Sequence, residues 1–357
     1  MMIRTGAASL PLHSGRCPRW LFPRMVKLSR EISKTVILEY GEDKFLTRLS
    51  NPFFFQSLGC VIGFDWHSSG LTTTTCAALK EALNKENLGI RLAGGKGAAS
   101  KRTLEEVKKL GEANISTLLR ASRLSAKVDN ALVQDNYQLY HHAIAFSEKG
   151  SWTVIQQGLN PENRYARRYH WLSTQEAKLD DFTEEPHEAI CCDLRGETLD
   201  LTSRRSREAR EVSLDLVRDN PEHLQGYLSK QATLLDFDLP RAHQIPEMDK
   251  RNLKTLQQAY EIQPQTYEEL ISIRGVGPKT VRALALVAKL VYGADLSWED
   301  PATFSFAHGG KDGIPYPVDR ALMDETTRIL RNAVEEAKVG AKEKLHALRR
   351  LSAFLQD

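Results

Sequence analysis

One stretch of the chain constrains the fold more than any other. Residues 137–147 and 151–157 alternate between apolar and polar side chains and are rich in residue types that favour β-structure. Only three residues, ending in Gly150, separate the two segments, and a short loop with a glycine is typical of a β-hairpin. The chain is therefore expected to contain an antiparallel sheet, to which residues 189–201 could add a strand.

Most of the remaining sequence has helical periodicity. Apolar residues recur at helical spacing over residues 20–48, 72–83 and 116–132. From residue 204 onward the pattern is helical almost to the end, whereas the glycine-rich residues 94–97 predict a loop. The expected fold class is therefore α+β, with an N-terminal α+β domain over residues 1–203 and an all-α domain over residues 204–357.

The composition narrows the class of protein. Of the 357 residues, 41% are hydrophobic and 27% are charged, which excludes a wholly disordered chain. No run of about 18 apolar residues is present, so neither a transmembrane helix nor a membrane partner is expected. The five cysteines form no Cys-x-x-Cys pair, which argues against a zinc ribbon or a disulfide framework and favours the cytoplasm. The net charge is only +3, which is too small to indicate a polyanion partner by itself. The distribution of charge along the chain must therefore be considered.

The strongest motif lies in the C-terminal half. Residues 266–273 predict a short helix, residues 278–292 predict a second, and Arg274-Gly275-Val276-Gly277 joins them. The glycines permit a tight turn and close approach to another molecule, and the N-terminus of the second helix suits a phosphate. Residues 274–289 contain four cations and no acid, so salt-dependent contact with the DNA backbone is expected. The residues expected to make this contact are Arg274, Gly275, Gly277, Lys279 and Arg282.

This segment resembles the helix-hairpin-helix motif of DNA repair proteins and, more narrowly, the helix-hairpin-helix DNA glycosylase superfamily. In bifunctional members of that group, a lysine just after Gly-Val-Gly is the nucleophile and an aspartate in a downstream Val-Asp motif assists it. The matching residues here are Lys279 and Asp319, and Pro317-Val318-Asp319 is similar to the archaeal 8-oxoguanine glycosylase branch. The resemblance implies that Lys279 expels a damaged or mispaired base through a Schiff base, with no cofactor. Asp319 would orient the lysine, take a proton or stabilise positive charge.

A second constellation lies in the N-terminal half. Asp65 and His67 are two residues apart, so that both would face one side of an extended segment. Together with Asp135 and His141 they could hold Mg²⁺ or Mn²⁺, and a metal so held could hydrolyse a phosphodiester. The alternative is that Asp65 caps a helix or pairs with an arginine and that His141 or His142 is a hydrogen-bonded sheet residue.

A third group of residues interleaves cations with aromatic rings over residues 163–171. Arg164, Arg167 and Arg168 could grip phosphates while the neighbouring rings stack on exposed bases. The alternative is that the rings pack in the core and the arginines pair with Glu184 and Glu185.

Four segments together resemble one further family. They are residues 10–15, 18–21, 63–70 and 164–171. They resemble the prokaryotic, mainly archaeal, domain-of-unknown-function family 763. The resemblance implies a shared architecture over most of the chain and no established activity.

Three functions remain open at this stage. The first is a DNA glycosylase/AP lyase with Lys279 as nucleophile and Asp319 assisting, acting on duplex, damaged or branched DNA alongside other repair proteins. The second is a metal-dependent DNA nuclease whose chemistry lies in the N-terminal domain. The third is a non-catalytic DNA-binding protein in which Lys279 contacts only phosphate and Asp319 is a plain helix N-cap.

Overall fold

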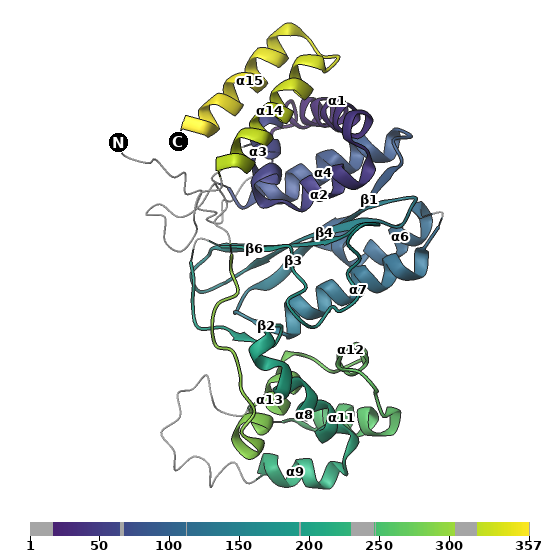
Figure 1. Cartoon of the computed structure of the whole chain (residues 1–357), viewed down its shortest axis with the longest axis vertical. Coiled ribbons are helices and arrows are strands. Elements are labelled where there is room, and N and C mark those ends of the chain that lie inside the picture. Colours follow the sequence, from purple (N-terminus) through teal and green to yellow (C-terminus); the bar gives the residue numbers. More distant parts are fainter. Residues whose placement is uncertain are drawn as a thin grey trace.

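The computed structural model describes residues 17–64, 68–111, 113–192, 194–229, 246, 248–303 and 320–356. A five-stranded antiparallel sheet lies at the middle of the molecule, and helices cover both of its faces (Figure 1). Its strand order is β1-β3-β4-β5-β6, with bounds Ile90–Lys96, Gln138–Ser147, Trp152–Leu159, Ala166–Ser173 and Ala189–Cys191. A separate two-stranded ribbon pairs β2 (Val133–Gln134) with β7 (Leu199–Asp200). The expected α+β class is therefore confirmed.

The predicted hairpin is the centre of the sheet. Strands β3 and β4 pair antiparallel, with Phe146 opposite Trp152 across the connecting loop. Gly150 has φ +90° in that loop, a conformation that glycine adopts without strain. Strand β1 was not predicted, because Gly94 and Gly95 suggested a loop. They instead complete a strand that pairs with β3.

One face of the sheet is covered by helices from both ends of the chain. The predicted helix over residues 20–48 is in fact two helices, which break at Gly41 with φ +86°. These helices share a hydrophobic core with the last two helices of the chain. The bounds are α1 Phe22–Tyr40, α2 Glu42–Ser50, α3 Pro52–Ile62, α4 Gly70–Lys85, α14 Arg320–Glu336 and α15 Ala341–Gln356.

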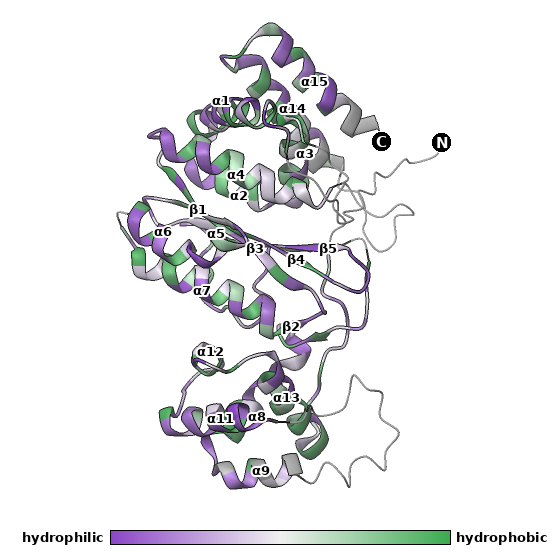
Figure 2. Cartoon of the chain, turned by 180° about the vertical axis from the view of Figure 1, so that it is seen from behind, coloured by the Kyte–Doolittle hydropathy of each residue, from purple (hydrophilic) through white to green (hydrophobic). Residues whose placement is uncertain are grey.

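The opposite face packs on α7, which joins the sheet to a helical lobe. Apolar residues of α7 and of the lobe belong to one continuous core. Figure 2 shows the mainly hydrophobic α13 among the more hydrophilic α8 and α11. The bounds are α5 Ala98–Lys101, α6 Thr103–Leu110, α7 Ile115–Ala131, η1 Arg204–Ser206, α8 Arg207–Arg218, α9 Pro221–Ser229, α11 Lys250–Ile262, α12 Tyr267–Ser272 and α13 Pro278–Tyr292.

The packing of the last two helices departs from the predicted division at residue 203. Helix α14 contacts α1 and α3, and α15 contacts α3, so both belong to the layer of the N-terminal helices. The helical lobe itself is formed from α8, α9, α11, α12 and α13 (Figure 1). Helical periodicity cannot reveal this difference, because an amphipathic helix records that it has an apolar face and not which partner covers it.

Candidate nucleic-acid interface

The glycine turn between α12 and α13 has the form that the sequence predicted. Thr266 caps α12 by accepting a hydrogen bond from the backbone amide of Glu269 at 3.1 Å. Gly275 has φ +101°, and a Cβ at this position would lie 2.7 Å from Oγ1 of Thr255 in α11. The fold therefore requires a glycine at residue 275 for reasons internal to the protein.

Gly277 differs from Gly275 because nothing in the fold demands a glycine there. Its backbone is extended, with φ −124°, and the nearest atom to an added Cβ would be a carbonyl oxygen 3.9 Å away. Gly277 is the N-cap of α13, and no side chain caps this helix. Pro278 follows at the first helical position, where its missing N–H costs nothing. The first turn of α13 therefore presents backbone amides that could donate hydrogen bonds to an anion.

Exposed cations surround this helix N-terminus. Arg274 and Lys279 lie on either side of Gly277, and both are exposed. Helix α11 lies alongside, because Asn252 Nδ2 is 3.4 Å from Oγ1 of Thr280. It adds three further exposed cations, which are Lys250, Arg251 and Lys254. Within the described ranges none of these five cations forms an ion pair, so their charge is available to a polyanion.

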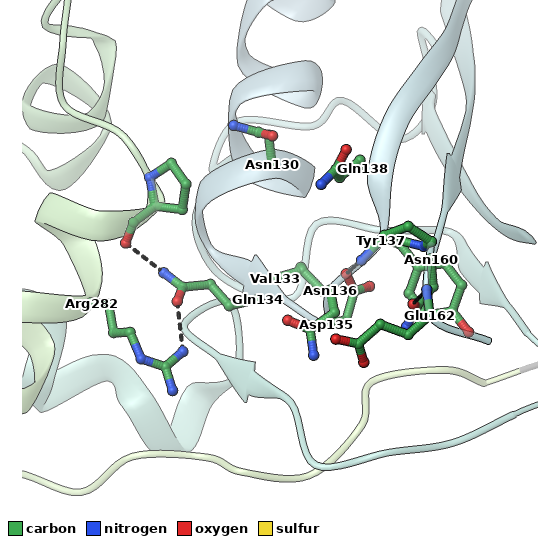
Figure 3. A pocket seen from close by; sticks show the side chains of 12 residues that line it. Asn130, Val133, Gln134, Asp135, Asn136, Tyr137, Gln138, Asn160, Glu162 and Arg282 are labelled. Carbon is green, nitrogen blue, oxygen red and sulfur yellow. Dashed lines mark hydrogen bonds between the residues drawn. The ribbon is translucent and has the colours of Figure 1, made fainter. Parts of the chain in front are cut away.

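Two side chains from outside the helical lobe hold the turn in place. They belong to the part of the molecule that contains the two sheets and α7, called the body below. Lys127 of α7 donates to the carbonyl oxygen of Val276, and burial lowers the pKa of this lysine. Gln134 donates to the carbonyl oxygen of Pro278 at 2.9 Å and accepts from Arg282 at 2.9 Å (Figure 3). Arg282 is half-buried, so its role differs from the free phosphate contact expected of it, because its guanidinium is engaged in fixing α13 to the body.

A polar cavity of about 320 Å³ lies between the body and the start of α13. Pro278 and Arg282 line it from the helical lobe, and most of the other lining residues come from α7, β2, β3 and the loops beside them (Figure 3). Amide side chains dominate the lining, namely Asn130, Gln134, Asn136, Gln138 and Asn160. These amides donate and accept hydrogen bonds, and Asp135, Glu162 and Arg282 add charged groups to the same lining.

The arginine-rich stretch does not form the exposed surface that the sequence suggested. Arg167 is 1% exposed and is ion-paired with Asp135 at 3.0 Å and with Asp300 at 2.6 Å. Arg168 is completely buried and donates to Gln56 on the other face of the sheet, at 3.0 Å. Neither guanidinium can reach a phosphate. Only Arg164 is exposed, in the loop before β5.

The alternative interpretation of that stretch was half right. The rings of Tyr169 and Trp171 are buried in the core, as it proposed. The predicted arginine partners were wrong, because Glu184 and Glu185 pair instead with arginines that follow residue 203. Those arginines are Arg204, Arg207 and Arg210.

The four residues proposed for a metal are only partly placed by the structure. Asp65 and His67 lie outside the described residues, as does Asp319, the expected partner of Lys279. Asp135 lines the cavity beside α13, whereas His141 lines a different cavity and is fully buried. Burial lowers the pKa of His141 to about 3. Within the described part of the chain, no three His, Cys, Asp or Glu side chains are grouped so that they could hold a metal ion.

The expectation of a hydrogen-bonded histidine in the sheet is confirmed for His142, but the sequence interpretation missed the hydrogen-bonded chain to which it belongs on the α7 face. Ser122 Oγ lies 2.8 Å from Nε2 of His142, and Nδ1 of His142 lies 2.8 Å from Oε1 of Gln156. Gln156 in turn donates to the buried carboxylate of Asp129. The only signal in the sequence was the pair His141-His142, because neighbouring residues of a strand point to opposite faces.

The fold and this site define an α+β protein whose helical lobe presents a basic glycine turn beside a polar cavity. The chain belongs to the family described as Protein of unknown function (DUF763), whose profile matches residues 6–318. No curated protein and no solved structure gives a significant match to the chain. None of the described helices is both long enough and apolar enough to cross a membrane.

Proposed function

We propose that the protein binds duplex DNA through the turn between α12 and α13, which acts as a helix-hairpin-helix element. The observation that carries the proposal is the geometry at Gly277. The fold leaves open space at this residue, the helix that follows has no side-chain cap, and exposed cations flank both sides. A phosphate approaching the backbone would use the open space, the amides and the positive charge together.

The proposed contact is with the DNA backbone and reads little sequence. Backbone amides and lysine or arginine side chains recognise phosphate oxygens, which are the same at every base pair. The binding should therefore depend strongly on salt. The proposed surface consists of Arg274, Gly277, Lys279 and the cations at the start of α11.

A salt titration of DNA affinity tests this proposal. Fluorescence anisotropy with a labelled duplex should give a log–log salt slope that falls by about 1 for each phosphate contact removed. The double variant Arg274→Ala/Lys279→Ala should thus reduce the slope by about 2. Lys108→Ala, which removes an exposed cation from α6, is the matched control and should leave the slope unchanged.

The variant Gly277→Ala separates binding from folding. Its methyl group meets no protein atom closer than 3.9 Å, so the midpoint of unfolding should fall only by the small cost of alanine at a helix N-cap. DNA affinity should nevertheless fall by about tenfold or more, because charge-assisted backbone hydrogen bonds would be blocked. If Gly277→Ala binds normally and the double variant keeps the wild-type slope, the interface is not at this turn.

A glycosylase/lyase reaction is the second candidate. It is favoured by the position of Lys279, which is exposed in the first turn of α13 directly after Pro278, a residue that lines the polar cavity. In this proposal Lys279 is the Schiff-base nucleophile and Asp319 assists it, with no cofactor.

Borohydride trapping in EDTA tests the second candidate. A duplex carrying an abasic site, 8-oxoguanine or uracil should give a covalent adduct that is absent from Lys279→Ala. DNA binding without an adduct would leave the protein as a non-catalytic binder. Strand cleavage that appears only with Mg²⁺ or Mn²⁺ would instead favour the metal-dependent nuclease.

A further inference from the structure

We propose that a second site, on the α7 face of the sheet, hydrolyses small carboxylic esters, with Ser122 as nucleophile and His142 as general base. Ser122 is on α7, His142 is on β3 and Gln156 is on β4. The helix and the sheet therefore contribute one side each to the site, and their packing sets its geometry.

The hydrogen bonds of this chain can run in only one direction. The amide nitrogen of Gln156 faces the carboxylate of Asp129, so the amide oxygen must be the atom that faces His142. That oxygen can only accept, so Nδ1 of His142 carries the hydrogen. Nε2 is then the bare nitrogen, and it accepts from the hydroxyl of Ser122 at 2.8 Å. This is the arrangement that a general base needs next to a serine nucleophile.

A buried carboxylate holds the last member of this hydrogen-bonded chain in place. Asp129 Oδ2 also accepts from Nε1 of Trp171 at 3.1 Å, and Oδ1 lies 2.5 Å from Nε2 of His187. Burial raises the pKa of Asp129, whereas its contacts with His187 and Trp171 favour the carboxylate. The negative charge of the carboxylate would lie one amide group away from His142, where it stabilises the imidazolium that forms when the base takes a proton. Gln156 and Asp129 are therefore positioning residues.

The hydroxyl and the imidazole open into a cavity of about 290 Å³. Leu104, Ala126 and Leu139 give this cavity an apolar lining, whereas Lys101 and Arg123 supply positive charge. Its volume and lining suit a small ester with an apolar acyl group. Burial lowers the pKa of His142 to about 4, so the imidazole is neutral near pH 7 and its Nε2 is unprotonated.

The proposed reaction proceeds through an acyl-serine. Oγ of Ser122 attacks the carbonyl carbon while its proton moves to Nε2 of His142, and the charge on the carbonyl oxygen is stabilised by Lys101 and Arg123. The bond between the carbonyl carbon and the alcohol oxygen then breaks, and the alcohol leaves with the proton from Nε2. Water attacks the acyl-serine, gives one proton to Nε2, and releases the carboxylic acid as Oγ recovers that proton.

Labelling of the full-length protein with a fluorophosphonate probe tests the proposal. Intact mass and peptide mapping should show one adduct on Ser122, together with hydrolysis of p-nitrophenyl acetate or butyrate. The adduct should be absent from Ser122→Ala, and labelling should slow by about a hundredfold or more in His142→Gln. Ser125→Ala is the matched control, because Ser125 is a buried serine on the same helix and is outside the proposed chain.

A second measurement keeps the test informative if an alanine variant is unstable. In Ser122→Cys, the neighbouring imidazole should make the new thiol at least about tenfold more reactive with iodoacetamide than the thiol of Ser125→Cys. Failure of wild type to form an adduct would overturn the proposal, as would an adduct that persists in Ser122→Ala. Equal reactivity of the two cysteine variants would also overturn the proposal. The hydrogen bonds from Ser122 to Asp129 would then be a purely structural link between α7 and the sheet.

Discussion

Replacing Arg167 should destabilise the protein more than almost any other single change of a charged residue. The guanidinium is 1% exposed and neutralises two carboxylates that are themselves buried. It lies 3.0 Å from Asp135 in the loop after β2 and 2.6 Å from Asp300 in the segment after α13. One side chain of β5 thus connects the sheet to the segment that follows the helical lobe.

The magnitude follows from what remains after the change. In Arg167→Met the hydrophobic stem is kept, but both carboxylates stay buried without a cation. Removal of one partner from a buried ion pair costs about 3–5 kcal/mol, because the remaining charge has lost its hydration and has no compensation. Against a typical total stability of about 5–15 kcal/mol, this change should remove a large fraction of the free energy of unfolding.

Urea unfolding followed by circular dichroism measures the effect. Arg164→Met is the matched control, because Arg164 is exposed in the loop three residues earlier, and it should change stability by no more than about 0.5 kcal/mol. The triple variant Arg167→Met/Asp135→Asn/Asp300→Asn should recover much of the loss, because no charge is left buried alone. A loss below about 1 kcal/mol in Arg167→Met, or a triple variant no more stable than the single one, would refute the reasoning.

Three further predictions rest on other parts of the fold. Gly275→Ala should lower the free energy of unfolding by about 1–3 kcal/mol, since the methyl group would sit at positive φ and 2.7 Å from Thr255; an unchanged urea midpoint would contradict this. Acidification should also destabilise the protein, because burial lowers the folded pKa of His141 to about 3 and the unfolded chain takes up the proton near pH 6.5. Between pH 7 and pH 5 this histidine should cost about 2 kcal/mol, and His141→Gln should reduce the loss measured by urea unfolding at both pH values by that amount. The rest of the loss should remain, because burial also lowers the pKa of His142 and of His170. In the native protein Cys17 should react first with a thiol reagent, since it is the only one of the five free cysteines that is not buried; rapid reaction of more than one thiol would contradict the packing.

The parts of the fold that could be predicted are those whose signal is local. The β3–β4 hairpin, α7 and the pair α12–α13 each follow from periodicity and from a glycine at the turn. Strand β1 could not be recognised, because its last residues include Gly94 and Gly95, and it becomes a strand only by pairing with β3. The position of α14 and α15 was equally out of reach, because it depends on an apolar face offered by α1 and α3, far away in the sequence.

The candidate site divides in the same way. The glycine turn with Arg274 and Lys279 could be predicted, because turn chemistry and local charge are properties of a few neighbouring residues. The burial of Arg167 and Arg168 could not be predicted from the sequence. An alternating strand predicts that these two side chains point to opposite faces, but not that helices cover both faces. The hydrogen-bonded sheet histidine could be predicted as His141 or His142, but not its partners Ser122 and Gln156, which come from other elements.

Buried polar residues form two rows across the middle of the sheet, one on each face. His142, Gln156 and Tyr169 are paired across β3, β4 and β5 on the α7 face, while His141, Gln157 and Arg168 are paired on the other. A sheet covered on both sides is ordinarily apolar, because each buried polar group must be given a partner. On the α7 face that requirement is met by the connected hydrogen bonds from Ser122 to Asp129.

The two proposed activities, DNA binding at the glycine turn and ester hydrolysis at the polar row, depend on different features of the fold. The turn lies at the surface of the helical lobe, and its proposed contacts depend on open space at Gly277 and on exposed charge. The row lies inside the sheet, and its proposed chemistry depends on the direction of buried hydrogen bonds. Gly277→Ala should therefore weaken DNA binding by about tenfold or more while the fluorophosphonate adduct still forms, and Ser122→Ala should lose the adduct while DNA affinity stays the same. Loss of both properties in either variant would mean that the two sites act as one, through the contacts of Lys127 and Gln134 that join α7 and β2 to the turn.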